Sequence, residues 1–382
     1  MCTYTTTVPS DMCIYTTTVP SDVCIYTTTE PNPLMCVYIL PQYPLICVFI
    51  LPQYVLICVF ILPQYPTRSL LQSSQFITVL SLVGRRPEEG DVLPVSKFCL
   101  KMCWVDKFSD VPQCQKFFLD GTTPNLPGIL VGGIVKDQNR YKPICQLFNN
   151  TYRFATLYDT FNRIPVFSAY TFSGPPTGPR PKDPWMIEPQ LDGIDRPEMQ
   201  KQEGGSYEHQ AVQNDYRDSQ NKWLNRGHLF PNSHAHYLDT QKSTFTLTNI
   251  VPQVVSFNGG SWKEMERNVR EKLMTDCFSN DQIKAYVVTG AVPNNNNNKL
   301  NNRVNIPYLM WTAFCCKNKM YMKNKKWIAG AHWGLNKKGE ALNQLTLGAL
   351  EEKLKKYHKG KNITVKVFPG DCPRVTKPTT SS

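Results

Sequence analysis

The chain is predicted to adopt an α+β fold, on three observations. Segments rich in aromatic and β-branched residues, typical of strands, are mixed with amphipathic helical segments between residues 114 and 372. These segments do not alternate regularly as strand, helix and strand, so a doubly wound parallel sheet is not indicated. The first 66 residues are an internal repeat that follows neither pattern.

The repeat separates the chain into parts. Units of eleven or twelve residues, such as CIYTTTVPSDV and CVYILPQYPLI, each contain one cysteine and at least one proline. This period suits neither a long helix nor a usual solenoid. We therefore expect a low-complexity repeat without a compact fold in 1–66 and a linker or degraded export segment in 67–103. The folded domain is expected in 104–372, with a tail in 373–382.

The excess positive charge belongs to the later part. The first 103 residues hold five Lys or Arg and six Asp or Glu, whereas the whole chain has 42 and 30. The densest run, from Lys317 to Lys361, has twelve lysines and three acidic residues. This pattern favours a polyanionic partner such as nucleic acid or a membrane surface, and a solvated lysine-rich face explains it equally well.

The first elements of the domain are predicted to be a β-hairpin. Residues Tyr152–Leu157 and Ile164–Phe172 are rich in aromatic and β-branched side chains and are separated by a turn around Asp159 and Asn162. The following segment, Ser173–Gly205, is rich in Pro, Gly and charge. It is expected to be a long irregular connection over the surface.

The middle of the domain is predicted to contain a strand and then a helix. The alternation in STFTLTNIVPQ indicates a strand that stops at Pro252. In SWKEMERNVREKL, apolar residues recur at helical spacing, and Ser261 with Glu264 matches a capping box at the start of a helix.

The last part of the domain is predicted to be two strand regions and a closing helix. AYVVTGAV indicates a buried strand, followed by an Asn-rich loop at residues 294–298. YLMWTAFCC and KWIAGAHW indicate a further strand pair, and LNQLTLGALEEKLKKY a closing amphipathic helix.

The cysteines of the later part indicate an oxidising compartment. They are scattered and form no paired C-x-x-C motifs of the kind that hold structural zinc. The adjacent Cys315 and Cys316 are expected to bond to different partners. Sequons at Asn149 and Asn362 agree with an extracellular or secretory location, although no ordinary signal peptide is visible. The segment Leu70–Val83 is too short and too polar to be a membrane span, so we expect no transmembrane segment.

The segment NRGHLFPNSHAH, residues 225–236, concentrates three of the six histidines in a stretch too rich in Gly, Pro and Asn to be a regular helix. His228, His234 and His236 raise the possibility of a zinc cage, but carboxylate and thiolate partners are missing nearby, which favours a polar loop. Downstream, Asn249, Asn258 and Glu266 follow, and a strand, a turn and a helix could bring His228 and Asn258 together.

At these spacings, RGH with TNIVPQ, FN, W and ME resembles the DNA/RNA non-specific endonucleases of the ββα-metal class, over about Cys114 to Cys372. The resemblance implies a ββα-metal (His-Me finger) fold with a central, mainly antiparallel sheet. It also implies hydrolysis of phosphodiester bonds in DNA, RNA or both, with little sequence specificity.

The resemblance further implies roles for single residues. His228 would be the general base, Asn258 the direct ligand of Mg²⁺, and Glu266 a holder of metal-bound water. Mn²⁺ or another divalent ion is the alternative to Mg²⁺. These roles suit the chemistry, because neutral imidazole can accept a proton from water and Mg²⁺ keeps most of its own waters.

Three further residues complete the implied site. Asn249 would orient it, Arg226 would support the phosphate or the loop, and Arg180, ahead of Trp185, is the nearest match to a phosphate-binding arginine of the family. One position departs from the family, because its usual Asp before RGH is Asn225 here. Asn225 keeps a hydrogen-bond acceptor but loses a charge that raises the basicity of its surroundings, so either activity is reduced or the position is tolerant. Because His228 and Asn258 are both present, activity is favoured. The alternative function is therefore a catalytically weak, nuclease-like protein that binds nucleic acid or acts as a scaffold.

Overall fold

The computed structural model describes residues 46–50, 55–60, 79–83, 106–182, 185–217, 223–279, 282–296, 298–318, 327–358 and 364–375. The chain divides into two compact units, Met1–Cys99 and Leu100–Ser382. In the first unit, β1 (Ile46–Ile50), β2 (Val55–Phe60) and β3 (Val79–Val83) form an antiparallel sheet. Two of these strands lie in the repeat, and the rest of the repeat is outside the described residues. The expectation that the repeat has no compact fold stays a prediction.

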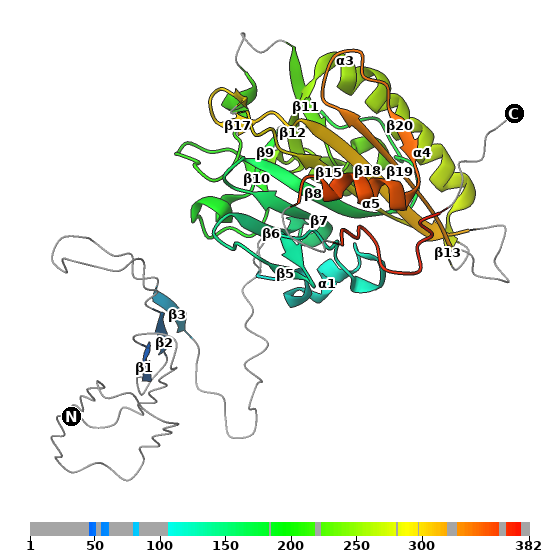
Figure 1. Cartoon of the computed structure of the whole chain (residues 1–382). Helices are drawn as coiled ribbons and strands as arrows, with labels where there is room; N and C mark the ends of the chain where they lie inside the picture. Colours follow the sequence, from blue (N-terminus) through cyan, green and yellow to red (C-terminus); the bar gives the residue numbers. More distant parts are fainter. Residues whose placement is uncertain are drawn as a thin grey trace, which may run out of the picture. The chain divides into compact units, whose positions relative to one another are not determined.

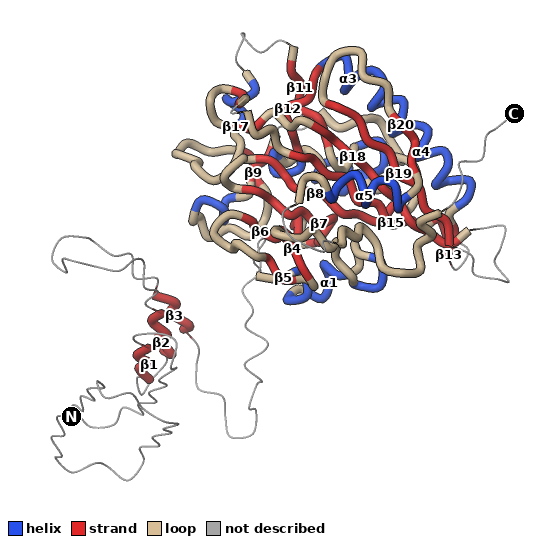
Figure 2. The backbone as a smooth tube through the Cα atoms, viewed as in Figure 1, coloured by secondary structure: helices blue, strands red, loops and turns tan. Residues whose placement is uncertain are grey.

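The second unit is built on a seven-stranded sheet that is antiparallel throughout (Figures 1 and 2). Its strands, in spatial order, are β20 (Asn343–Leu345), β19 (Trp327–Leu335), β18 (Leu309–Lys317), β15 (Ala285–Val292), β8 (Ile164–Phe172), β7 (Thr151–Asp159) and β6 (Tyr141–Phe148). The architecture confirms the predicted α+β class with a central antiparallel sheet.

Short elements surround this sheet. The longest helices are α4 (Lys263–Asp276) and α5 (Leu347–Lys355); the other helices are α1 (Pro112–Gln115), α2 (Leu238–Ser243) and α3 (Val255–Phe257). Strands outside the central sheet are β4 (Leu130–Val131), β5 (Ile134–Val135), β9 (Met186–Ile187), β10 (Gln200–Lys201), β11 (Leu224–His228), β12 (Ile250–Val254), β13 (Phe278–Ser279), β14 (Gln282–Ile283), β16 (Lys299–Leu300) and β17 (Val304–Asn305). No helix in the described ranges is long and apolar enough to span a membrane.

The predicted strands formed where long runs of apolar residues could be buried on both faces. The hairpin β7–β8 is confirmed, with Ala155 opposite Ala169. The strand pair β18–β19 and the strand β15 are also confirmed. Strand β6, which pairs with β7 at the edge of the sheet, had not been predicted.

The sheet has a hydrophobic core on each face. Successive residues of a strand point to opposite faces, and on β15 Val287 joins one core whereas Val288 joins the other. The first core includes the buried side of α4, and the second includes the buried side of α5. Helix α5 crosses in front of the sheet in Figure 1. The two long helices therefore cover opposite faces.

The predicted strand in STFTLTNIVPQ was wrong in its first half. Residues 238–243 are helix α2, residues 247–249 are a 3-10 turn, and strand β12 begins only at Ile250. The alternating Thr246 and Thr248 instead donate their hydroxyls to Glu188 Oε1, at 3.0 and 3.4 Å. The strand also continues past Pro252 to Val254. Proline is tolerated there because its carbonyl accepts from Asn336 and thus points away from the partner strand, so the missing N–H costs no ladder bond.

The predicted capping box of the long helix was also wrong. Helix α3 and a π-turn over Asn258–Trp262 run directly into α4, so Ser261 does not begin a helix. Its hydroxyl donates instead to the Glu340 carbonyl at 2.7 Å. The apolar face is as predicted, since Trp262, Met265 and Leu273 are buried.

The predicted surface connection over Ser173–Gly205 is irregular but not wholly superficial. It contains β9, which is buried and bonds to the segment before β12 through Met186 N and Phe245 O at 2.9 Å. The closing helix begins later than predicted. Asn343–Leu345 add strand β20 to the sheet, and Thr346 then caps α5 by accepting from Ala349 N.

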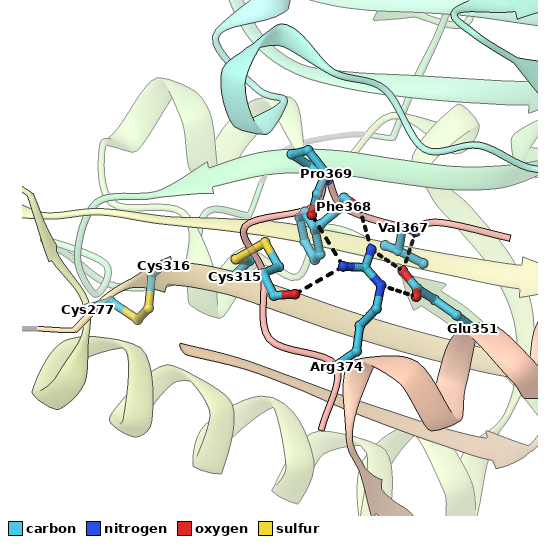
Figure 3. The surroundings of a disulfide bond; sticks show 9 residues. Cys277, Cys315, Cys316, Glu351, Val367, Phe368, Pro369 and Arg374 are labelled. Carbon is cyan, nitrogen blue, oxygen red and sulfur yellow. Dashed lines mark hydrogen bonds and ion pairs between the residues drawn. A yellow bond between two sulfur atoms is a disulfide. The ribbon is translucent and has the colours of Figure 1, made fainter. Parts of the chain in front are cut away.

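Three disulfides fix the domain, and Cys99 and Cys103 lie outside the described residues. Cys114 bonds to Cys145, Cys277 to Cys316, and Cys315 to Cys372. The adjacent cysteines of β18 therefore have different partners, as predicted. One bond ties β18 to the end of α4, and the other ties it to the segment after α5 (Figure 3).

Arg374, which we had assigned to the tail, is part of the packed domain. Its guanidinium forms two hydrogen bonds with the buried Glu351 carboxylate, at 2.7 and 3.1 Å (Figure 3). It also donates to the carbonyls of Phe368 and Cys372 at 2.8 and 3.0 Å. The packing of the domain therefore includes Arg374, beyond the disulfide at Cys372.

Candidate active site

The site begins at a two-stranded ribbon. Strands β11 and β12 are antiparallel, with His228 opposite Ile250 and Arg226 opposite Pro252. Because side chains alternate along a strand, Arg226 and His228 share one face of the ribbon and Asn225 lies on the other. Asn225 is exposed and its side-chain oxygen accepts from Arg226 N at 3.2 Å.

His228 occupies a buried aromatic pocket at the end of β11. Its ring lies 5.6 Å from the Trp185 ring and 5.3 Å from the Phe245 ring. Burial, reinforced by the charge of Arg180, lowers the pKa of His228 to about 3. The imidazole is therefore neutral, and its Nε2 has no hydrogen-bond partner within the described part of the chain.

Both predicted arginines lie beside this pocket. Arg180 is exposed, and its guanidinium lies 5.1 Å from the centre of the Phe245 ring. Its charge lowers the pKa of both His228 and Glu266, so it is close to both side chains. Arg226 lies between Trp185 and Tyr216, at 5.2 and 5.1 Å from the two rings. The cation and the imidazole thus contact the same tryptophan.

Asn249 is fully buried and bonds to the chain around His228. Its side-chain oxygen accepts from Phe230 N at 2.9 Å and from Ser168 Oγ at 2.8 Å. Its amide nitrogen donates to the carbonyls of Phe230 and Thr244, both at 3.0 Å. With two acceptor and two donor bonds, the amide is saturated. Asn249 therefore has no free group for a substrate, and it ties the segment after His228 to the central sheet.

The ribbon leads into the helix that carries the remaining candidates. Asn258 is half-buried at the start of the π-turn, and Glu266 is half-buried about two helical turns further along. Burial raises the pKa of Glu266 to about 8, while the nearby Trp262 indole, Arg180 and Lys263 act in the opposite direction. The indole N–H does not meet hydrogen-bond geometry with any described group.

The three histidines do not form a metal cage. The His234 Nε2 lies 2.8 Å from the Glu266 carbonyl, which can only accept, so Nε2 donates and Nδ1 accepts from the Tyr170 hydroxyl at 2.8 Å. The His236 Nδ1 bonds to the Pro175 carbonyl. Over the described ranges, no three His, Cys, Asp or Glu side chains are grouped as a metal site. Both ring nitrogens of His234 and the Nδ1 atom of His236 are therefore engaged in hydrogen bonds within the protein.

Sequence reasoning missed the structural role of His234 and the nearby Arg270. His234 joins strand β8, through Tyr170, to the helix turn at Glu266. Arg270 is half-buried one turn beyond Glu266. Burial lowers the pKa of His234, and the charge of Arg270 lowers it further, whereas the hydrogen bond to the Glu266 carbonyl raises it. The helical spacing of Glu266 and Arg270 was visible in the sequence and was the signal that could have identified the arginine.

Gly227 is required by close packing inside the ribbon. A Cβ atom at this position would overlap Gln253 Oε1 and would lie 2.6 Å from Gln253 Cβ, and Gln253 is fully buried. We expect Gly227→Ala to lower the free energy of unfolding by about 1–3 kcal/mol, because a packed side chain must be displaced. Urea unfolding measures this change. Gly370→Ala is the matched control, since a Cβ there meets nothing within 4 Å. Equal stability of the two variants would contradict the prediction.

A two-stranded ribbon that ends in a histidine and runs into a helix bearing Asn258 and Glu266 defines the ββα-metal class of nuclease folds. The model of the DNA/RNA non-specific endonuclease family matches residues 134–368. The chain belongs to this family.

Two relatives and one solved structure show how far the similarity extends. The chain is 33% identical over 212 residues to the human Endonuclease domain-containing 1 protein, a match that covers 53% of this chain and 39% of the human protein. The mouse protein of the same name is 32% identical over 215 residues, covering 53% and 38%. The chain thus spans less than half the length of these relatives. A chain in the crystal structure of the EndoG/EndoGI complex shares 19% sequence identity with this chain, and the match covers 55% of this chain and 84% of that one. The TM-score of 0.37 is too low to infer a shared arrangement.

Proposed function

We propose that the chain hydrolyses phosphodiester bonds in DNA or RNA with little sequence specificity, with His228 as the general base and a divalent metal ion as cofactor. The observation that carries the proposal is the state of His228, a neutral imidazole whose Nε2 has no partner among the described residues. The nearby Arg180 supplies a positive charge that attracts a phosphate. A neutral base beside a cation is the arrangement that activates water against a phosphodiester.

The low pKa of His228 is compatible with this role. Part of the depression comes from Arg180. An anionic phosphate bound next to Arg180 offsets that positive charge, so the pKa of the imidazole rises toward the working pH once substrate is present. His228 then accepts the proton of the attacking water, and Trp185 and Phe245 hold its ring in place.

The donor atoms present fit Mg²⁺, with Mn²⁺ or another divalent ion as the alternative. Asn258 offers a half-buried amide oxygen as a direct ligand, and Glu266 offers a carboxylate that holds metal-bound water. The Glu266 carboxylate is destabilised by burial, and a nearby divalent cation would favour its charged form. When bound, such an ion stabilises the negative charge that develops on the phosphate oxygens.

The remaining candidates support these groups. Asn249 positions the segment after His228 through its four hydrogen bonds and is a positioning residue. Arg226 bridges two aromatic rings, so it holds the ribbon face that His228 shares. Asn225 lies on the opposite face of the ribbon and keeps a hydrogen bond to Arg226 N, so the missing carboxylate does not remove a group from the pocket.

The three disulfides also support a location. Such bonds persist in oxidising compartments, so we assign the protein to the secretory pathway or the extracellular space. Nucleic acid is its partner in this proposal.

The deciding experiment incubates the purified full chain with plasmid DNA and with RNA, in Mg²⁺ and in chelator. We expect cleavage of both polymers in Mg²⁺ and none in chelator. If the chain binds nucleic acid but no divalent ion supports cleavage, the proposal is overturned. That result would favour the alternative of a nuclease-like binding or scaffold protein. If the chain binds without cleaving, Asn225→Asp tests the cause. Restored cleavage in this variant would show that the missing carboxylate is the reason why the unchanged chain does not cleave.

A further inference from the structure

A second cavity lies outside the site described above. It has a volume of about 710 Å³ and is lined by the loop at residues 126–129, the starts of β6, β8 and β18, the end of β15, and the end of α5. Leu354 of α5 and Trp311 of β18 belong to the core on the α5 face of the sheet, whereas α4 packs on the other face. None of the residues that line the cavity is one of the active-site candidates. Its size suits a nucleotide-sized ligand.

Two tyrosines present exposed aromatic faces in this cavity. Tyr308 and Tyr357 are 44% and 37% exposed, and their ring centres lie 6.4 Å apart at 52°. The backbone of both tyrosines is held by hydrogen bonds. Tyr308 N donates to the Val292 carbonyl at 2.9 Å and its own carbonyl accepts from Asn336 N at 3.0 Å, while Tyr357 N donates to Leu354 O at 3.0 Å. Exposed, rigidly mounted aromatic rings are platforms on which nucleobases stack.

A preorganised arginine lies in the same cavity. Arg140 donates through Nε and Nη2 to the two oxygens of the Asp159 carboxylate, at 2.9 and 2.6 Å. Its guanidinium also lies 4.9 Å from the centre of the Tyr141 ring and 5.3 Å from that of Phe161. Held in this way, it still has Nη1, for which no described residue is a hydrogen-bond partner. An arginine fixed in one orientation with donors left over is suited to a phosphate.

The acid in the cavity does not repel an anion. The Asp159 carboxylate is buried and accepts from Phe161 N, Asn162 N and the Asn162 side chain, at 3.1, 3.1 and 2.7 Å, besides its bonds to Arg140. Its charge is thus already compensated, and the exposed Lys356 adds a second cation. The exposed amides of Asn295 and Asn296 lie at the same cavity and can hydrogen-bond base edges.

We propose that this cavity is a binding site for single-stranded nucleic acid, in which a base stacks on Tyr308 or Tyr357 and a backbone phosphate contacts Arg140. The choice of nucleic acid as the occupant rests on the proposed function, since an enzyme acting on polynucleotides gains affinity from a second contact along the same strand. A duplex keeps its bases stacked inside and is not captured in this way.

The test measures binding of fluorescein-labelled dT12 and U12 to the full chain by anisotropy, in chelator so that no strand is cleaved. We expect Tyr308→Ala and Tyr357→Ala each to weaken binding by about fivefold or more. Tyr237→Ala is the matched control, because Tyr237 is 62% exposed and does not line the cavity, and it should bind like the unchanged chain. Because all three tyrosines are exposed, these substitutions should leave the melting temperature unchanged.

The outcomes separate this site from the proposed nuclease activity. Unchanged affinity of Tyr308→Ala and Tyr357→Ala for both oligonucleotides overturns the site, even if the chain cleaves plasmid DNA in Mg²⁺. Tyrosine-dependent binding by a chain that cleaves nothing supports the site and counts against the nuclease. An equal loss of affinity for a 12-base-pair duplex would overturn base stacking as the mode of binding.

Discussion

Replacement of His228 by alanine is expected to slow cleavage by about two to four orders of magnitude, the usual cost of losing a general base. The loss should fall on turnover, because the imidazole acts on the attacking water and is not a ligand of the metal in this proposal. Affinity for Mg²⁺ and for DNA should therefore persist. Plasmid cleavage gives the rate, and calorimetric titration with Mg²⁺ gives the metal affinity.

Two controls make the result for His228 interpretable. His228 is buried between Trp185 and Phe245, so the melting temperature of the variant must be measured, and His228→Gln keeps more of the volume. His236→Ala removes a histidine of the same loop whose side chain hydrogen-bonds only to the Pro175 carbonyl among described partners. Full activity of His228→Ala would refute the general base. Loss of metal affinity together with activity would identify His228 as a ligand instead.

Replacement of Asn258 by alanine is expected to raise the Mg²⁺ concentration needed for half-maximal cleavage by about tenfold or more, on the scale seen when groups that support a metal are removed. The physical reason is that the side chain is the direct protein ligand in the proposal, while the base at His228 is untouched. At saturating Mg²⁺, much of the rate should return. A titration of cleavage against Mg²⁺ at fixed DNA measures the shift.

The two nearest comparisons are Asn258→Asp and Ser256→Ala. The aspartate retains an oxygen ligand and adds charge, so its Mg²⁺ requirement should not rise. Ser256 is exposed two residues earlier, and its loss should change nothing. An unchanged Mg²⁺ requirement in Asn258→Ala would mean that the metal is held elsewhere.

The large elements could be predicted because they depend on local patterns. The buried runs of β15 and β18 and the apolar stripe of α4 carry their structure in consecutive residues. The errors arose where distant groups compete. Thr246 and Thr248 alternate like a strand, yet a buried Glu188 almost sixty residues away binds their hydroxyls. Ser261 matches the sequence pattern of a helix N-cap, but its hydroxyl donates a hydrogen bond to the Glu340 carbonyl instead.

The site was predictable only in outline. The motif located His228, Asn258 and Glu266, and the structure places the first on a strand and the others on the helix that follows. That Arg180 would lie beside Phe245 could not be read from the sequence, because the two residues are far apart in the chain and several strands and helices lie between them. Nor could the saturated bonding of Asn249, which depends on Ser168 in the central sheet.

The neighbouring cysteines of β18 have a consequence for how the protein matures. Cys315 faces the core on the α5 side and Cys316 faces the core on the α4 side. Exchange of their partners would require β18 to turn over, which means a slip of one residue against both neighbouring strands. Only chains that have already paired β18 in its native register can close both bonds without strain. The two native disulfides therefore lock β18 in its native register once they have formed, because neither neighbouring strand can then slip by one residue against it.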